Sequence, residues 1–124
     1  MDGDTIKVED SILLSIKKLL GMDPEEFDQF DSDIIMYISA TIEILNQIGV
    51  DIPDNFTITD KNTTWDDYIK DPKYKVIQNS IKNYIYMKVR LVFDPPSTST
   101  LEKAIDDNIK ELEWRIRHGI EFPE

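Results

Sequence analysis

Apolar residues recur at helical spacing near the start of the chain, over about residues 10–20. The shared apolar face contains Ile12, Ile16, Leu19 and Leu20. This spacing predicts an amphipathic helix, and Leu14 falls outside its apolar face. Asp10 or Ser11 is suited to cap the amino terminus of this helix, and Gly21 is suited to its carboxyl-terminal end.

A second and longer apolar pattern begins near Ser32, after an acidic linker, and ends before Gly49. Its face contains Ile34, Ile38, Thr41, Leu45 and Ile48, widened by Ile35 and Ile42. A broad apolar face at this period predicts a helix with one side in the core. We expect this helix to be the main core element.

The helical period is lost over residues 50–63. Pro53, Asp54 and Asn55 mark a turn, and the apolar residues after them alternate with threonines. The segment is therefore predicted to be irregular, with a short extended piece or a hairpin arm as alternatives. Thr64 followed by Asp67 then predicts a capped helix of one or two turns, which ends before the proline at position 72.

Residues 73–93 are predicted to form a third long helix. Its apolar arc contains Ile77, Ile81, Tyr84, Ile85, Leu91 and Val92. The opposite face carries a polar stripe of Lys75, Asn79, Lys82, Tyr86 and Arg90. Lys88 does not follow this division, because its helical angle places it in the middle of the apolar arc.

A rigid corner follows this helix at Asp94, Pro95 and Pro96. Neither proline can donate the next backbone hydrogen bond, so the helix must end there. Ser99 followed three residues later by Glu102 is the pattern of a capping box, which predicts the start of the last helix.

The last helix is predicted to run from about residue 100 to residue 118. Its core face contains Leu101, Ile105, Ile109, Leu112 and Ile116. Gly119 is suited to end it, and Trp114 projects away from the core face. Together these patterns predict a small all-α fold of about four main helices in a single domain over 1–124, with flexible tails at 1–9 and 119–124.

Charge is distributed unevenly along the 124 residues, whose net charge is −11. Residues 73–93 hold five of the 14 lysines and arginines and none of the 25 acids. The overall charge argues against broad binding of the DNA backbone, which requires a basic surface. A basic segment in an acidic protein indicates that charge selects a neighbour. The chain has no cysteine, which excludes disulfides and favours a reducing compartment.

The sequence offers no arrangement of residues typical of an active site, a metal centre or a cofactor site. His118 is the lone histidine, and a surface position near the helix end is the simplest interpretation. The acidic tract Asp23, Glu25, Glu26, Asp28, Asp31 and Asp33 lacks the glycine and final glutamate of a calcium loop. We expect no enzyme activity and no cofactor. No apolar run approaches the length of a membrane span, and no secretory signal is recognisable.

Three features favour contact with another protein chain, and each has an alternative interpretation. Trp114 lies off the core face, so it is either an interface residue or packed under the tail Ile120-Glu121-Phe122. Lys88 either reaches solvent or an acid of its own chain, or faces a neighbour. The stripe of Lys75, Lys82, Tyr86 and Arg90 either meets another chain or offsets acids of the same molecule.

Several segments together resemble the head-tail connector, or adaptor, proteins of long-tailed double-stranded DNA phages and prophages. They are SILLSIKKLLGM at 11–22, DSDIIMYISATIEILNQIGV at 31–50, WDDYI at 65–69, and the stretch from residue 85 to residue 116. Within that stretch, YMKVRLVFDPP and ELEWR are the most specific parts. The resemblance covers nearly the whole chain, from about Ser11 to Arg117.

The resemblance implies a structural subunit of the virion neck, assembled in the host cytoplasm. Proteins of that family form a ring, usually of twelve copies, beneath the portal protein. The ring extends the DNA channel without gripping the DNA and docks the next neck or tail protein, and the family has no catalytic residues to transfer. Two alternatives remain from the residues alone: an acidic protein that mimics DNA, and a small monomeric binding module.

Overall fold

The computed structural model describes residues 6–122, which fold into helices without a β-strand. The elements are α1 (Ile12–Leu19), the 3₁₀ turn η1 (Asp28–Phe30), α2 (Asp31–Ile48), α3 (Trp65–Tyr68), α4 (Pro72–Lys75), α5 (Gln78–Phe93) and α6 (Ser99–Glu121). The predicted all-α fold class is therefore confirmed. The four main helices match α1, α2, α5 and α6.

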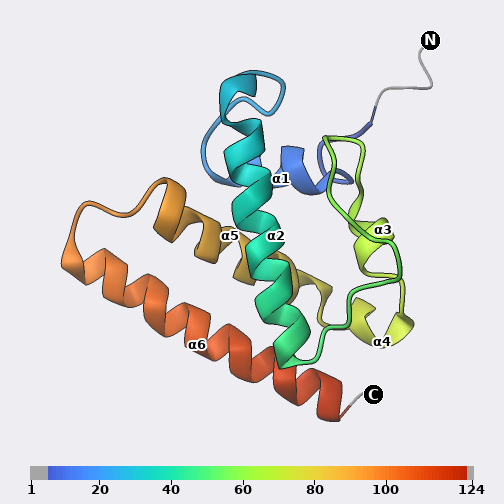
Figure 1. The fold of residues 1–124 in the computed structure, drawn as a ribbon. Helices are drawn as coiled ribbons and strands as arrows, with labels where there is room; N and C mark the ends of the chain where they lie inside the picture. The colour runs from blue at the N-terminus through green and yellow to red at the C-terminus, as the bar shows by residue number, and fades with distance from the viewer. Residues whose placement is uncertain (1–5, 123–124) are drawn as a thin grey trace.

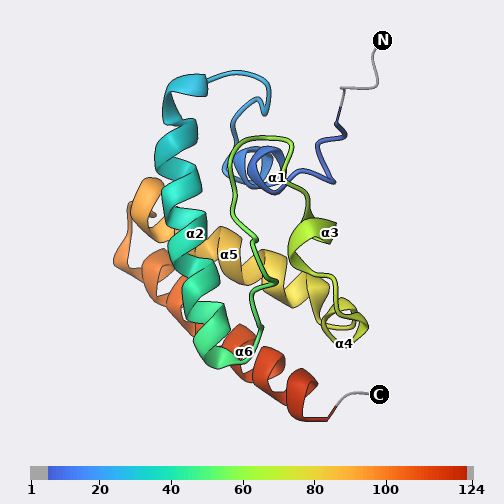
Figure 2. The same cartoon turned by 45° about the vertical axis from the view of Figure 1, so that its right-hand side comes forward.

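Helices α2, α5 and α6 form the centre of the fold. Figure 1 shows α2 crossing in front of α5, with α6 along the lower edge of the molecule. The most extensive pairings are those of α5 with α6 and of α2 with α5. Figure 2 shows α1 on the side of α2 that carries α3 and α4. The core joins apolar side chains of all these helices and of the connection between α2 and α3.

Helix α1 begins as predicted but buries a different face. The Ser11 hydroxyl accepts a hydrogen bond from the Leu14 backbone N–H at 3.1 Å, so Ser11 is the cap. Leu14, predicted to lie off the core face, is buried, whereas Leu19, predicted to lie on it, is 48% exposed. The prediction was wrong because it assumed that only one face of the helix is covered by the rest of the protein. The loop at residues 59–62 also lies beside α1, where Leu14 faces it.

The segment predicted as a hairpin arm contains no hairpin. It is an irregular loop whose Val50 and Ile58 are buried in the core. Its end is attached to α1 through hydrogen bonds from the Ile12 N–H to the Thr63 carbonyl and from the Trp65 N–H to the Asp10 carbonyl. The loop therefore pairs with a preceding segment rather than with itself.

The short helix predicted after the loop is confirmed. Thr64 and Asp67 form the reciprocal capping box of α3, in which each side chain accepts from the other residue's backbone N–H. Capping of this kind supplies partners for backbone donors that a helix start would otherwise leave unpaired.

The single helix predicted over residues 73–93 is two helices. Helix α4 starts at Pro72, with the Asp71 carboxylate accepting from the Lys73 N–H, and Ile77 leaves helical geometry before α5. The Tyr74 hydroxyl donates to the Gly49 carbonyl and accepts from the Asp51 N–H, both at 3.1 Å. These contacts fasten α4 to the end of α2, a tertiary constraint that helical period does not report.

The apolar arc predicted for this stretch is also narrower than expected. Ile81, Tyr84, Ile85 and Val89 are the buried residues of α5. Val92, predicted to lie in the core, is 59% exposed. It lies in the last turn of α5, two residues before the corner.

The last helix is displaced from its predicted limits at both ends. Its cap is Thr98, whose hydroxyl accepts from the Leu101 N–H at 3.2 Å, so Ser99 is the first helical residue. The predicted Ser99–Glu102 capping box is therefore wrong, and Glu102 instead lies in the first turn, where an acid favours the helix dipole. Leu101, predicted to be buried, is 52% exposed because it lies in the exposed first turn of α6.

Gly119 does not end α6, which continues to Glu121. A Cβ atom at Gly119 would lie 2.3 Å from Cγ2 of Ile77, so the absence of a side chain lets α6 approach the start of α5. Within the tail predicted at 119–124, residues 119–121 are thus helical, and Phe122 follows the end of the helix. Residues 1–5 and 123–124 lie outside the described residues.

Candidate protein-interaction surfaces

The predicted basic stripe is divided between two helices. Lys75 belongs to α4, whereas Lys82, Tyr86 and Arg90 lie on α5. The Lys75 ammonium donates to the Asp66 carboxylate at 2.7 Å, and this bond and its charge hold the pKa of Asp66 below the ordinary value. The alternative that the stripe offsets acids of its own molecule is therefore correct at Lys75.

The rest of the stripe also makes contacts within the chain. The Lys82 ammonium lies 5.2 Å from the centre of the Trp65 ring, a cation–π geometry. The Arg90 guanidinium donates to the Tyr86 hydroxyl at 3.4 Å. Lys82, Tyr86, Lys88 and Arg90 are all partly buried. Two of the three cations of α5, Lys82 and Arg90, are thus in contact with aromatic side chains of their own chain.

Trp114 is the first of three neighbouring aromatic side chains at the end of α6, which we call the aromatic ladder. Trp114 is 63% exposed, and its ring stacks on His118, with 4.8 Å between ring centres and 12° between planes. His118 in turn lies 4.8 Å from Phe122, which is 61% exposed. The alternative that Trp114 packs under its own tail is therefore wrong. The sequence signal for the ladder was the spacing of four residues, which places all three rings on one helix face.

The corner after α5 connects α5 to α6. The Asp94 backbone N–H bonds to the Arg90 carbonyl at 2.8 Å, and Pro95 and Pro96 follow without helical geometry. Further along the pair, the Tyr84 hydroxyl donates to the Glu113 carboxylate at 2.8 Å. Burial raises the pKa of Tyr84, and the bond to Glu113 raises it further. This bond joins α5 to α6 in addition to their apolar contacts.

A buried lysine, which sequence analysis missed, organises the acidic tract. Lys17 on α1 is fully buried, and its ammonium lies 2.6 Å from the Glu26 carbonyl and 2.8 Å from the Asp31 carboxylate. Phe27, between these partners, has a left-handed backbone with φ of 59° and stacks on Phe30. Nothing in the local pattern distinguishes Lys17 from the exposed Lys18 beside it.

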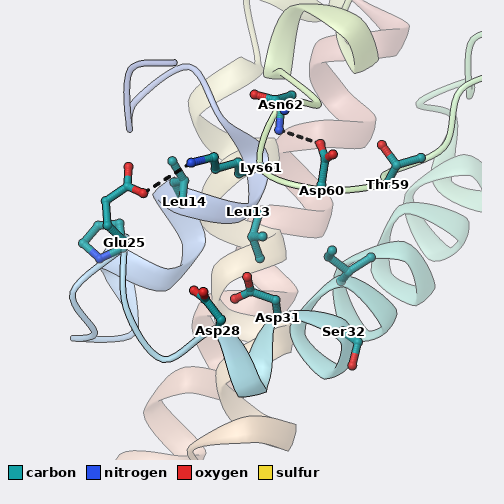
Figure 3. A pocket seen from close by; sticks show the side chains of 12 residues that line it. Leu13, Leu14, Glu25, Asp28, Asp31, Ser32, Thr59, Asp60, Lys61 and Asn62 are labelled. Carbon is teal, nitrogen blue, oxygen red and sulfur yellow. Dashed lines mark hydrogen bonds and ion pairs between the residues drawn. The ribbon is translucent and has the colours of Figure 1, made fainter. Parts of the chain in front are cut away.

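A groove of about 570 Å³ lies between α1, the η1 turn and the 59–62 loop. We call it the acidic groove, and its lining includes Leu13, Leu14, Pro24, Glu25, Asp28, Asp31, Ser32, Ile35, Thr59, Asp60, Lys61 and Asn62. Figure 3 shows Leu13 between the Asp28 and Asp31 carboxylates on one side and the loop on the other. The Lys61 ammonium lies 3.6 Å from Glu25 at the edge.

Within residues 6–122, no group of three or more histidine or acidic side chains is arranged to bind a metal ion. None of the described helices has the length and apolar character needed to span a bilayer. The features that remain for interpretation are surfaces: the α5 cations, the aromatic ladder on α6 and the acidic groove.

The chain was compared with protein-family models, with curated proteins and with solved structures. Neither the curated proteins nor the solved structures contain a match to the chain. The model of the family described as phage connector protein matches residues 12–121. Connector proteins join the parts of a virion, so the interaction of such a subunit is with other head and tail proteins. Because the match spans most of the sequence, the chain belongs to the phage connector protein family.

Proposed function

We propose that the protein is a head-tail connector subunit that assembles as a ring beneath the portal protein, extends the DNA channel and docks the next neck or tail component. The observation that carries this proposal is the family match over residues 12–121. The whole chain acts as one domain, and the ring has twelve copies, as the resemblance implies. Assembly takes place in the host cytoplasm.

The charge of the chain suits a passage through which DNA slides. A net charge of −11 per copy gives a ring a strongly negative field, which repels phosphate and prevents the channel from gripping DNA. A catalytic role is not required for this function, since the subunit acts by position and charge alone.

The contact surfaces of this proposal are the cations of α5 and the aromatic ladder of α6. Trp114 is exposed over most of its surface, and an exposed tryptophan favours an interface because its large ring gains most from desolvation. Lys82, Lys88 and Arg90 supply positive charge that attracts an acidic neighbour, and Tyr86 holds Arg90 in place. Another copy or the portal protein meets these surfaces.

Native mass spectrometry over a concentration series, with and without a portal ring, tests the assembly. We expect cyclic oligomers, or a monomer that becomes a ring only when the portal is present. A monomer that ignores the portal but competes with DNA for a DNA-binding protein would contradict the proposal. That result would favour the DNA mimic, which the net charge alone also accommodates.

Two variants test the contact surfaces. Trp114→Ala should weaken assembly by about tenfold or more through lost buried area, whereas Leu101→Ala, an exposed apolar residue on the same helix, is the matched control. Lys82→Glu with Arg90→Glu should also block assembly. Its control is the pair Lys7→Glu with Lys18→Glu, which makes the same change in net charge at exposed positions away from α5 and α6. Normal assembly of both test variants would remove these surfaces from the proposal.

A further inference from the structure

The acidic groove combines two chemistries that together fit a segment of protein. The partly exposed Pro24 and Ile35 provide an apolar floor above the buried Leu13 and Leu14. Carboxylates of Asp28 and Asp60 lie at its rim. A volume of about 570 Å³ lies within the range of pockets that bind ligands in proteins. Apolar surface beside negative charge recognises an apolar side chain next to a cation, because each group then finds a complementary partner.

The groove is held in its shape before any partner arrives. The buried Lys17 binds both the Glu26 carbonyl and Asp31, which fixes the acidic turn against α1. Phe27 keeps a left-handed backbone, a conformation that costs a phenylalanine about 1–2 kcal/mol and that occurs preferentially at functional sites. A preformed groove loses less entropy on binding than a flexible loop would.

The same chain carries a complementary segment at the junction of α4 and α5. Val76, at 68% exposure, is the most exposed large apolar side chain of the described residues. Lys73, three residues earlier, is exposed, with its ammonium 3.9 Å from Asp71 and 5.1 Å from the centre of the neighbouring Tyr74 ring. Both belong to the stretch 73–93, which contains no acid in a chain of net charge −11. In a second copy of the chain, this stretch is therefore the part that the carboxylates at the rim of the acidic groove would repel least.

The two surfaces lie in different parts of the molecule. In both Figure 1 and Figure 2, α4 lies at the opposite end of the molecule from the turn that precedes α2. A head-to-tail contact requires two such separate surfaces, and repetition of one contact closes into a ring when the rotation between copies permits.

We propose that the acidic groove receives the α4–α5 junction of a second copy, with Val76 on the apolar floor and Lys73 against Asp28 and Asp60. This inference rests on the self-assembly proposed above and names the contact that carries it. It assigns a function to the exposed Val76, to the buried Lys17 and to the strained Phe27, none of which the α5 and α6 surfaces explain.

Site-specific cross-linking tests the contact, because a chain without cysteine can receive thiols at chosen positions. The test variant carries Asn79→Cys, three residues after Val76, and Asn62→Cys in the groove lining, so Val76, Lys73, Asp28 and Asp60 stay unchanged. It is joined by a short bismaleimide after assembly with the portal ring. The control pairs Asn79→Cys with Leu101→Cys, which is exposed but lies outside the groove. We expect a ladder of covalent dimers, trimers and larger species from the test pair. A mixture of the two single variants should stop at the dimer.

The outcomes separate this inference from the proposed function. Rings that form normally while the test pair cross-links no better than the control would overturn the contact and leave the ring intact. Absence of any oligomer, with or without the portal, would overturn both. In an independent test, Lys73→Glu should weaken assembly by about tenfold or more, and adding Asp60→Lys should restore it.

Other occupants of the groove would also be recognised. If Asp28→Lys with Asp60→Lys abolishes docking of a different neck protein while rings and cross-links persist, the groove binds that protein and the proposal is wrong. If millimolar calcium or magnesium protects the groove residues from hydrogen exchange in the unassembled chain, and Lys73→Glu leaves assembly unchanged, the groove is a cation site instead.

Discussion

The close approach of α6 to the start of α5 at Gly119 makes a prediction whose sign depends on one other residue. A Cβ atom at position 119 would lie 2.3 Å from Cγ2 of Ile77 but 3.7 Å from its Cβ. The first distance is far below ordinary contact between carbon atoms, and the second is ordinary contact. Because Cγ2 is attached directly to Cβ, the isoleucine cannot move it aside without shifting its backbone or its rotamer.

Two opposing effects decide the result of Gly119→Ala. Overpacking of this kind costs about 1–3 kcal/mol, while replacing glycine by alanine within a helix gains about 0.5–1 kcal/mol. We therefore expect a net destabilisation of about 1 kcal/mol in the wild-type background. In an Ile77→Ala background the clashing atom is gone, so the same change should stabilise the fold by about 0.5–1 kcal/mol.

Urea unfolding followed by circular dichroism measures both effects as a double-mutant cycle. Ile81→Ala is the matched control, because it truncates a buried isoleucine of α5 that is not near a Cβ at position 119. Gly119→Ala should remain destabilising in that background, since separate sites act additively. The Gly119→Ala substitution could instead change the free energy of unfolding in the same direction whether residue 77 is isoleucine or alanine. In that case the clash with Ile77 is not the reason for glycine at position 119.

Two further predictions concern the charged pairs. Asp31→Asn should cost about 3–5 kcal/mol and more than Lys17→Met, because it leaves a fully buried ammonium without its carboxylate, whereas the Asp31 side chain is 31% exposed. The reverse order in urea unfolding would refute this. The bond to Lys75 lowers the pKa of Asp66 from the ordinary 3.8. The stabilisation of the fold by this pair is therefore fully present above pH 3.8 and is lost as the pH falls through the lowered pKa. Carboxyl chemical shifts followed by NMR should show the Asp66 pKa return toward 3.8 in Lys75→Met, and an unchanged pKa would contradict the assignment.

The sequence predicted those features of the fold that depend on local pattern. Helical spacing in α2 and α5 gave buried Ile34, Ile38 and Ile81, and the capping signals gave Ser11 and Thr64. In each case the information lies within a few residues, because a helix face and a cap are defined by near neighbours along the chain.

What could not be predicted depends on segments that are distant in sequence. Leu14 is buried because the 59–62 loop lies beside it, and the helix at 73–93 is divided because Tyr74 is bonded to the backbone at Gly49 and Asp51. The Thr98 cap differs from the predicted Ser99 by a single residue, an error to be expected where two neighbouring hydroxyl residues can both cap.

For the interaction surfaces, exposure was harder to predict than residue type. Trp114 was recognised from its helical angle, but Val76 lay in a stretch predicted as continuous helix, so its exposure at a break between two helices was not foreseen. The acidic groove was not predicted either, because its walls come from three segments that only the fold brings together.

Lys17 is the residue whose presence is hardest to explain by stability alone. A buried ion pair contributes little net stability, because desolvation of both charges offsets most of their attraction, and an apolar side chain of similar size often serves as well. What the pair does provide is a defined shape, since one ammonium holds a carbonyl and a carboxylate from both sides of the strained Phe27. In the ring proposed above, every copy presents the same docking surface, so a rigid turn serves that proposal better than a slightly more stable one. On this argument Lys17→Met should retain the folded monomer and yet impair the contact between copies.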